Sequence, residues 1–354
     1  MERYTYIDSL RAVAALVVIC RHTIMNMGNI GMMTTPAELA VFHFVDSAFD
    51  IGRFGVLVFF AISGFVVPFT LLKQRQKPVQ SFLISRFFRL YPVYWLSIPF
   101  GIYFFYTYPG IAIEPKTIGL NILLLQSFFG EENIMILYWT LQVELIFYAL
   151  CVLFFCTGWL QKNRAVFVAV LASIAGAVIL SAVQYMLHYK IRVGIPMSLA
   201  VMFWGILWRK YIVEGDIVAK KLAMISLAVF AVMIPMICRI AYASDISAAE
   251  NWLQLTITYY SAIIAFIVFT KYVPLQSKPL VYLGTISYCI YLFGTVAQKV
   301  TIRYLPELPE GYSLIYILIT MSIAIIWAML VHQLIELPSM KLGRRLIAKL
   351  QKSN

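Results

Sequence analysis

Long runs of hydrophobic residues alternate with short polar segments along the whole of this chain. Runs of the length that a membrane-spanning helix needs, about 20 residues, fall at about 8–27, 54–73, 90–108, 138–158, 165–186, 193–209, 222–241, 252–271, 281–300 and 312–335. A further apolar stretch, 118–130, has only about two-thirds of that length, which is typical of a re-entrant or buried segment. The pattern predicts an all-α fold class, a polytopic membrane bundle of about ten helices.

The composition agrees with a protein that lives in lipid. Of the 354 residues, 62% are hydrophobic and 12% are charged, and the mean hydropathy is +0.85. The predicted spans account for most of the residues and leave little room for a soluble domain. We therefore expect a single transmembrane domain over 1–340 and a short basic cytoplasmic tail over 341–354. The first span carries charges and has no small-residue cleavage site, which favours an uncleaved first helix.

The charges predict how the bundle lies in the membrane. The net charge of +12 does not indicate a nucleic-acid partner, because the basic residues form short clusters between apolar runs. With ten spans, the loops on the side of the termini are basic, and the opposite loops hold acidic residues such as Glu38, Asp46, Glu131 and Glu132. If 118–130 also spanned, the basic Arg209–Lys221 loop would be exported. We therefore predict ten spans with both termini cytoplasmic, and a tail helix held by anionic lipid headgroups.

Ionisable residues within the first span indicate function, because charges inside a membrane are costly. The span contains Asp8, Arg11, Arg21 and His22. Arg11 and His22 are eleven positions apart, about 16 Å along a helix, and share one face. A neutral imidazole away from bulk water can act as a general base. The structural alternative is that His22 only hydrogen-bonds a neighbouring helix while the arginines reach the two surfaces.

Glu144 lies near the outer end of the fourth span, at a depth comparable to that of His22. A carboxylate beside an imidazole fixes its tautomer and stabilises the imidazolium. We therefore expect that Glu144 or Asp8 orients His22. An interhelical polar pair that only holds the bundle together is the alternative.

Two further groups lie at the cytoplasmic surface. Arg86 and Arg89 are one helical turn apart, and two guanidinium groups so placed can grip phosphates. Plain positive-inside anchoring is the alternative for such a pair. Glu336, where the last span ends, is expected to pair with this arginine cluster or with Arg11 in a structural role.

No metal site is predicted. The five cysteines show no metal-ligand spacing and are interpreted as apolar packing residues. They are Cys20, Cys151, Cys156, Cys238 and Cys289.

Six segments, in order, resemble acyltransferase family 3, the membrane-bound O-acyltransferases of bacteria and some eukaryotes. They are DSLRA at 8–12 followed by His22, GVLVFFAISGF at 55–65, RFFRLYPVYW at 86–95, WTLQVE at 139–144, LGTISY at 283–288 and IELP at 335–338. The resemblance covers most of the chain and implies an acyl-CoA-dependent transfer, usually of acetyl, to a hydroxyl of a surface polysaccharide or its lipid-linked precursor. It also implies a bacterial cytoplasmic (inner) membrane location.

The resemblance also assigns roles to residues. His22 and Arg11 match the catalytic pattern, and Arg86 with Arg89 matches the motif that handles the acyl-CoA donor. The motif residues with supporting roles are Ser63, Gly64, Trp139, Tyr288 and Glu336. The expected partners are acyl-CoA, the glycan acceptor and membrane lipids, with no nucleic acid. The acceptor, the acyl length, direct transfer or an acyl-enzyme, and the oligomeric state stay open.

Two alternatives to catalysis remain at this point. A transporter or flippase for a glycolipid or small anion would use the same buried charges as a gated path, and broken helices in matched halves would indicate it. A partner that scaffolds a polysaccharide assembly complex would make those charges incidental.

Overall fold

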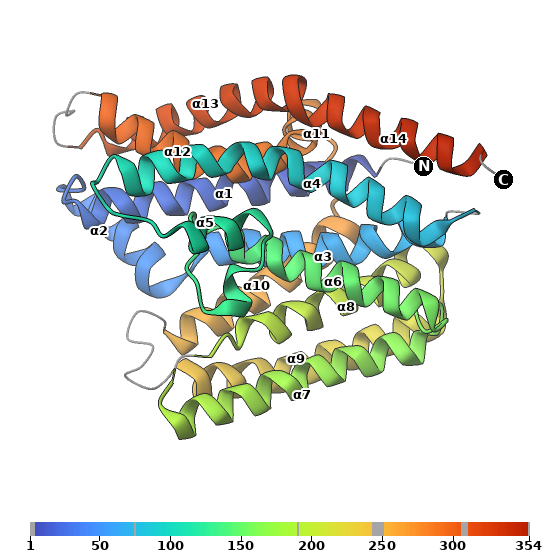
Figure 1. Ribbon diagram of the computed structural model, residues 1–354. Helices are drawn as coiled ribbons and strands as arrows, with labels where there is room; N and C mark the ends of the chain where they lie inside the picture. Colours follow the sequence, from blue (N-terminus) through green and yellow to red (C-terminus); the bar gives the residue numbers. More distant parts are fainter. Residues whose placement is uncertain (1–3, 74–75, 190, 243–250, 306–310, 353–354) are drawn as a thin grey trace.

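The computed structural model describes residues 4–73, 76–189, 191–242, 251–305 and 311–352, and within them it contains no β-strand. The long helices lie side by side along one common direction (Figure 1). They are α1 (Thr5–Asn29), α3 (Ile51–Leu72), α4 (Pro78–Ile102), α6 (Tyr138–Cys156), α7 (Asn163–Leu187), α8 (Gly194–Glu214), α9 (Ile217–Tyr242), α10 (Trp252–Lys271), α12 (Ser287–Tyr304) and α13 (Ser313–Val331). The shorter helices are α2 (Pro36–His43), α5 (Pro115–Ile122), α11 (Lys278–Thr285) and α14 (Leu337–Lys352).

The predicted fold class, a polytopic bundle of helices, is confirmed. Each of the ten predicted ranges falls on one of the long helices, the ninth of them shared with α11. By length and composition, seven helices of the described residues are able to cross a membrane, and the pair α11 and α12 makes an eighth if it counts as one bent span. Helices α4 and α8 are as long as these but carry more polar residues, including Arg86 and Arg89 on α4.

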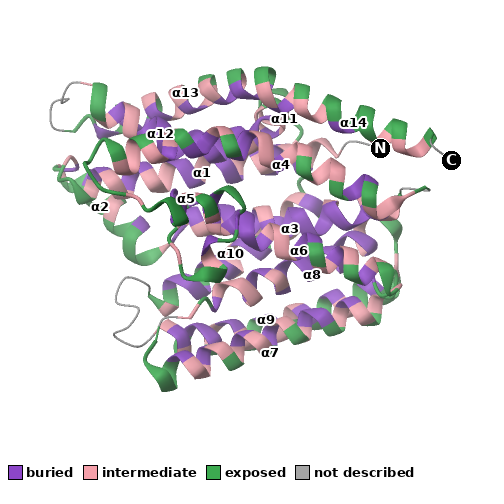
Figure 2. Ribbon diagram, viewed as in Figure 1, coloured by how far each residue is buried: buried purple, intermediate pink, exposed green. Residues whose placement is uncertain are grey.

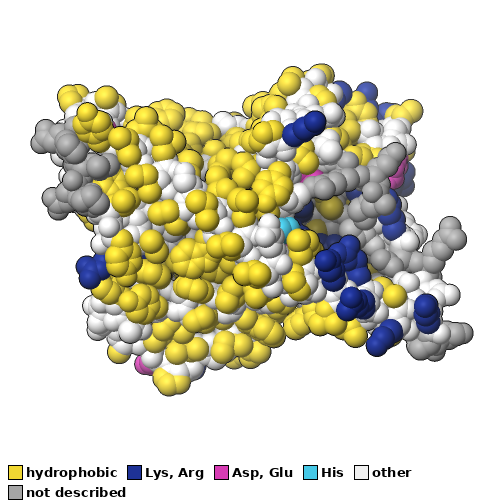
Figure 3. Space-filling model, turned by 90° about the horizontal axis from the view of Figure 1, so that it is seen from above, with side chains coloured by type: hydrophobic (Ala, Val, Ile, Leu, Met, Phe, Trp, Pro, Cys, Tyr) yellow, Lys and Arg dark blue, Asp and Glu magenta, His cyan; other side chains and the backbone are white. Residues whose placement is uncertain are grey.

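The two ends of the bundle differ in charge. The first and last described residues lie at the same end (Figure 1), as an even number of crossings requires. Seen from above, hydrophobic side chains cover most of the length of the molecule, and Lys and Arg side chains gather around a hollow at the end with the termini (Figure 3). This distribution agrees with the positive-inside pattern of the sequence, and the cytoplasmic position of this end stays a prediction.

The apolar segment 118–130 does not span. It contains the last five residues of the helix α5 (Pro115–Ile122) and one 3₁₀ turn, Gln126–Phe129. Backbone groups away from water need partners from the protein, and side chains of α4 and α6 supply them. The Tyr94 hydroxyl donates to the carbonyl of Asn121, the Trp95 indole donates to the carbonyl of Ile122 at 3.0 Å, and Gln142 donates to the carbonyl of Leu124 at 3.1 Å. These bonds fix the segment against the bundle.

The run 281–300 was predicted as one continuous span, and the structure corrects this. Helices α11 and α12 meet at an angle of 76° around Ile286. Gly284 explains where the chain turns, because it lies against the backbone of α1, where a Cβ atom would come within 1.8 Å of the Asp8 carbonyl oxygen. Helix α12 therefore begins inside the bundle, with Ser287 and Tyr288 in its first turn.

The most buried helices are α3, α12 and α8, while α7, α9 and α13 alternate buried and exposed positions as lipid-facing helices do (Figure 2). Close backbone approach holds α3 against α8, since a Cβ on Gly64 would lie 1.9 Å from the Met202 carbonyl oxygen. Gly64, predicted to be a supporting residue, is therefore a packing residue.

The predicted basic tail, 341–354, belongs to a longer helix as far as Lys352. Helix α14 starts at Leu337 and continues α13 through a π-helical turn, His332–Glu336. It packs on the first half of α4, where Gly343 lies against the ring of Phe88 and Lys77 donates to the carbonyl of Leu350 at 3.1 Å. The tail is thus a wall of the bundle at the end with the termini, and residues 353–354 lie outside the described residues.

Candidate functional site

A cavity of about 100 Å³ lies inside the bundle among α1, α3, α4, α6 and α12. Three arginines line it, Arg11 from α1 and Arg86 and Arg89 from α4, together with Glu144 from α6 and Tyr288 from α12. Charged groups at such a depth mark functional sites in membrane proteins. The two arginines of α4 line the same cavity because their spacing of three residues puts them on one helix face.

Arg86 is held in place from two sides. Its Nη2 atom donates to the hydroxyl of Thr70 on α3 at 3.2 Å. Its guanidinium lies over the rings of Phe82 and Tyr148, at 5.5 and 5.7 Å from their centroids. Its Nε–H is buried and has no hydrogen-bond partner among the described residues. A positioned guanidinium with an unused donor is suited to bind an anion.

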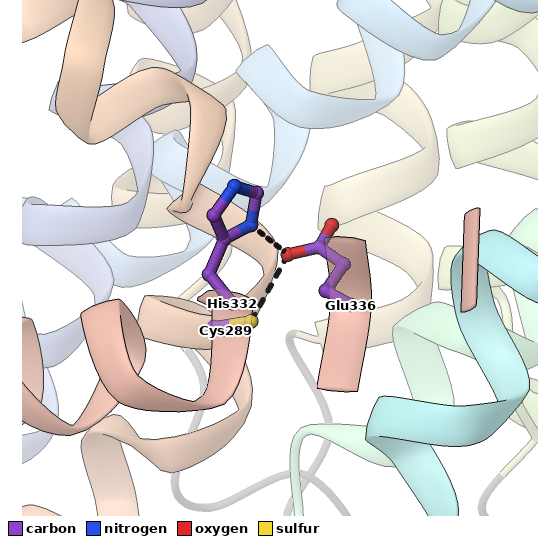
Figure 4. Close-up of side chains that lie close together, drawn as sticks. All are labelled: Cys289, His332 and Glu336. Carbon is purple, nitrogen blue, oxygen red and sulfur yellow. Dashed lines mark hydrogen bonds and ion pairs between the residues drawn. The ribbon is translucent and has the colours of Figure 1, made fainter. Parts of the chain in front are cut away.

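Arg89 is anchored by a carboxylate from the other end of the sequence. Its Nη1 atom lies 2.9 Å from Oε1 of Glu336, whose side chain is fully buried. The sequence left open whether Glu336 pairs with the arginine cluster or with Arg11, and in the structure it forms its ion pair with Arg89. The second carboxylate oxygen lies 2.6 Å from Nδ1 of His332 and accepts a hydrogen bond from Sγ of Cys289 at 3.1 Å. Figure 4 shows both side chains directed at this oxygen.

Cys289, His332 and Glu336 are also residue types that bind metals, and their ligand atoms all lie within 4.8 Å of one another. The sequence spacing could not indicate this group, and Cys289, interpreted as a packing residue, takes part in it. A cation there would lie beside Arg89, which already neutralises the carboxylate at 2.9 Å. Like charges repel strongly at such distances, so the arrangement favours a hydrogen-bonded network that aims Arg89 over a metal centre.

Glu144 is directed at the cavity. Its Oε1 accepts a hydrogen bond of 2.5 Å from the hydroxyl of Tyr148, one turn later on α6, and it lines the cavity together with Arg11. It was expected to orient His22, but His22 does not line this cavity. Tyr288 donates from its hydroxyl to the Leu90 carbonyl at 2.7 Å, which ties α12 to α4 at the cavity wall.

A second, wider cavity of about 780 Å³ opens at the end with the termini. Arg11 and Arg89 line it as they line the first cavity, and Asp8 and His332 also border it. The two arginines therefore stand at the boundary between the two spaces. Lys278 from α11 and Arg344 from α14 complete a ring of four cationic side chains around the wider cavity.

His22 lies farther along α1, beyond the far end of the first cavity. Val56 lines the first cavity, and its neighbour Gly55 lies against α1, nearest to the Ala14 carbonyl oxygen and then to Val17 and Val18. His22 follows Val18 by four residues, about 6 Å along the helix axis. His22 itself lines neither of the two cavities.

Other groups than those expected surround His22. Its backbone carbonyl accepts a hydrogen bond from Gln298 of α12. Arg21 and Asp50 are the charged groups that act electrostatically on the imidazole, and they form an ion pair of 2.8 Å between α1 and the start of α3. Asp50 had not been predicted as a site residue. It precedes an apolar run directly, as helix-capping residues do, which is the one signal that pointed to it.

The remaining predicted residues have supporting positions. Ser63 lines the first cavity, and the ring of Trp139 contacts Phe60 of α3 edge-on, with centroids 6.0 Å apart. Sequence reasoning did not single out Tyr148, although it lies one helical turn after Glu144, on the same face.

Comparison with known proteins agrees with the motifs. A family model described as an acyltransferase domain matches residues 4–332. No curated protein and no solved structure gives a significant match.

Proposed function

Because the chain belongs to this acyltransferase family, we propose that it transfers an acyl group, acetyl in the simplest case, from acyl-CoA to a hydroxyl of a cell-surface polysaccharide or its lipid-linked precursor. The observation that carries the proposal is the pair of cavities that share Arg11 and Arg89 in their linings. The wider one opens at the end with the termini, and the inner one is lined by Val56, whose neighbour Gly55 packs on the part of α1 that leads to His22.

Acyl-CoA suits this shape because it is a long molecule with charges at one end. In the proposal, its phosphates stay at the wide opening, where arginine side chains provide charge-assisted hydrogen bonds. Its narrow uncharged arm enters the first cavity, between Arg86 and the tyrosines of α6 and α12. The thioester at the tip of the arm then approaches the level of His22.

In the proposed reaction, the His22 imidazole accepts the proton of the acceptor hydroxyl as the hydroxyl oxygen attacks the thioester carbonyl carbon. The tetrahedral intermediate collapses, the carbon–sulfur bond breaks, and the departing sulfur takes the proton from the imidazolium. The ester remains on the acceptor. Asp50 and Arg21 replace Glu144 as the charged neighbours that set the polarity around the base.

Arg11 and His22 lie too far apart to have the same role in the reaction. They are separated by eleven residues of one continuous helix, about 16 Å along its axis, so they do not act on the same carbonyl group. We therefore assign Arg11 to the donor. The acceptor would approach His22 from the end of the bundle opposite the termini.

The test is acetyl transfer or hydrolysis from radiolabelled acetyl-CoA by the purified protein in lipid. Wild type is compared with His22→Ala, with Arg86→Ala/Arg89→Ala, and with Arg164→Ala as a control. Arg164 lies in the first turn of α7 and lines neither of the two cavities. The proposal expects turnover in wild type and the control only, with loss of donor binding in the double variant. An active, folded His22→Ala protein would overturn the role of the base.

A transporter is the second candidate, because the structure contains a broken span, α11 with α12, which the sequence did not show. Among the described residues this is the one bent pair, whereas inverted-repeat transporters carry such breaks in matched halves. Flux of a labelled glycolipid across proteoliposomes without any acyl donor would favour the transporter. Label leaving acetyl-CoA in wild type favours the enzyme.

A further inference from the structure

Two cations of the wider cavity, Lys278 and Arg344, have no role in the reaction as proposed. Lys278 begins α11, and Arg344 lies in the middle of α14. Both line the cavity, and among the described residues neither forms an ion pair with a carboxylate. Basic side chains that face one space from separate elements indicate an anionic ligand.

The tail helix presents two different faces. Leu337, Met340 and Arg344 follow one another at spacings of three and four residues and all line the wider cavity, so they form one face of α14. Lys341 and Arg345, which do not line it, are each one position from this face. Attraction of the tail to lipid headgroups accounts for Lys341 and Arg345, whereas Arg344, which is exposed like them, also lines the cavity.

The cavity-facing side of α14 is also held firmly. Met340 Sδ accepts from Nη1 of Arg89 at 3.3 Å, and Gly343 packs against Phe88. Arg344 therefore extends from a helix that is fixed to the same α4 that carries the cavity arginines. Because this helix is fixed, the backbone of Arg344 stays at the cavity.

We infer that Lys278 and Arg344 bind the phosphate groups of the nucleotide part of the donor, so that α14 forms one wall of the donor site. This inference rests on the proposed function and adds two residues and one element to it. The volume of about 780 Å³ falls in the range of ligand pockets, roughly 300–1,000 Å³. Arg11 and Arg89 lie at the inner side of the same cavity. Lys278 and Arg344 would therefore bind the phosphates that are farthest from the thioester.

Phosphate chemistry has two sources here, a nucleotide and an anionic lipid headgroup, and the experiment separates them. The full-length protein is placed in nanodiscs of neutral lipid, and binding of CoA and of adenosine 3′,5′-bisphosphate is measured by calorimetry at several salt concentrations. The variants are Lys278→Gln, Arg344→Gln and the charge-preserving Arg344→Lys. Arg345→Gln, one position along the same helix, is the matched control.

Both Gln variants should bind either nucleotide at least tenfold more weakly than wild type, and with a smaller dependence on salt. Arg344→Lys and Arg345→Gln should bind within about threefold of wild type. In turnover, the Gln variants should lose preference for acetyl-CoA over S-acetyl-N-acetylcysteamine, a thioester without phosphates. Melting temperatures identify any variant that fails to fold, and the Gln variant at the other of the two positions then carries the test.

Wild-type nucleotide affinity in both Gln variants would overturn the inference. It would also be overturned if the Gln variants lost only the stabilisation that anionic lipid gives and kept nucleotide binding, since the cavity would then hold a lipid headgroup. Failure of the proposed function looks different, because wild type would then turn over neither thioester.

Discussion

Replacing Glu336 with Gln tests the network that aims Arg89 at the cavities. The substitution keeps the size of the side chain and removes one negative charge from a fully buried position, 2.9 Å from Nη1 of Arg89. The guanidinium then remains in the bundle without its counter-charge. His332 and Cys289, which contact the other oxygen, cannot replace that charge.

The expected loss of stability follows from the burial of the two partners. Removing one partner of a buried ion pair costs about 3–5 kcal/mol. The Arg89 side chain is 28% exposed, toward the cavities, so part of its charge is solvated and we take the lower end, about 3 kcal/mol. This corresponds to roughly a hundredfold change in the unfolding equilibrium. Arg89→Gln/Glu336→Gln removes both charges and should recover most of the loss, leaving about 1 kcal/mol.

Unfolding by dodecyl sulfate, followed by the fluorescence of the seven tryptophans, gives the free energies. Glu131→Gln is the control, because it breaks an ion pair of similar length, 2.7 Å, with Lys116, whose side chain is 63% exposed. Surface pairs contribute little to stability. A single variant that loses less than about 1 kcal/mol, or a double variant no more stable than the single, would refute the charge argument.

Three further predictions concern packing, pH and metals. Gly284→Ala should lower the melting temperature clearly, because its Cβ would meet the backbone of α1, whereas Gly119→Ala, which meets nothing within 4 Å, should not. Hydrogen bonds from Ser313 lower the pKa of Glu38 from 4.5 to about 2, so this carboxylate stabilises the fold above about pH 4.5 and the stabilisation is lost as the pH falls toward 2. A flatter melting-temperature profile across that interval in Glu38→Gln confirms it, and an unchanged profile contradicts it. Treatment with 1,10-phenanthroline should leave turnover unchanged, and a loss that Zn²⁺ restores would identify the group around Glu336 as a metal site.

Sequence reasoning placed the helices well because apolar length alone decides where a chain can span. It also put Arg86 and Arg89 on one face, since a spacing of three residues fixes that within any helix. The break at Ile286 was not predictable in this way. It depends on how closely Gly284 approaches Asp8 of a distant helix, and a run of apolar residues carries no information on such an approach.

The partners of the charged residues were the least predictable part. Counting residues gave Glu144 and His22 similar depths, but depth does not say in which direction around the helix axis a side chain faces. Glu144 faces Tyr148 and the cavity. Asp50 and Arg344 lie at span ends, where a charge is ordinary, so only the folded arrangement distinguishes them from anchoring residues.

The wide cavity at one end of the bundle also has an electrical consequence. Water and ions that fill it carry the potential of that side inward, so a membrane voltage falls mainly across the protein between Arg11 and the opposite face. Each elementary charge that crosses this layer does work of about 2.3 kcal/mol per 100 mV. A donor that keeps its phosphates beside Arg89 and sends only a neutral acyl group past Tyr288 moves no charge through the layer. Its transfer rate would then be insensitive to the voltage of an energised membrane.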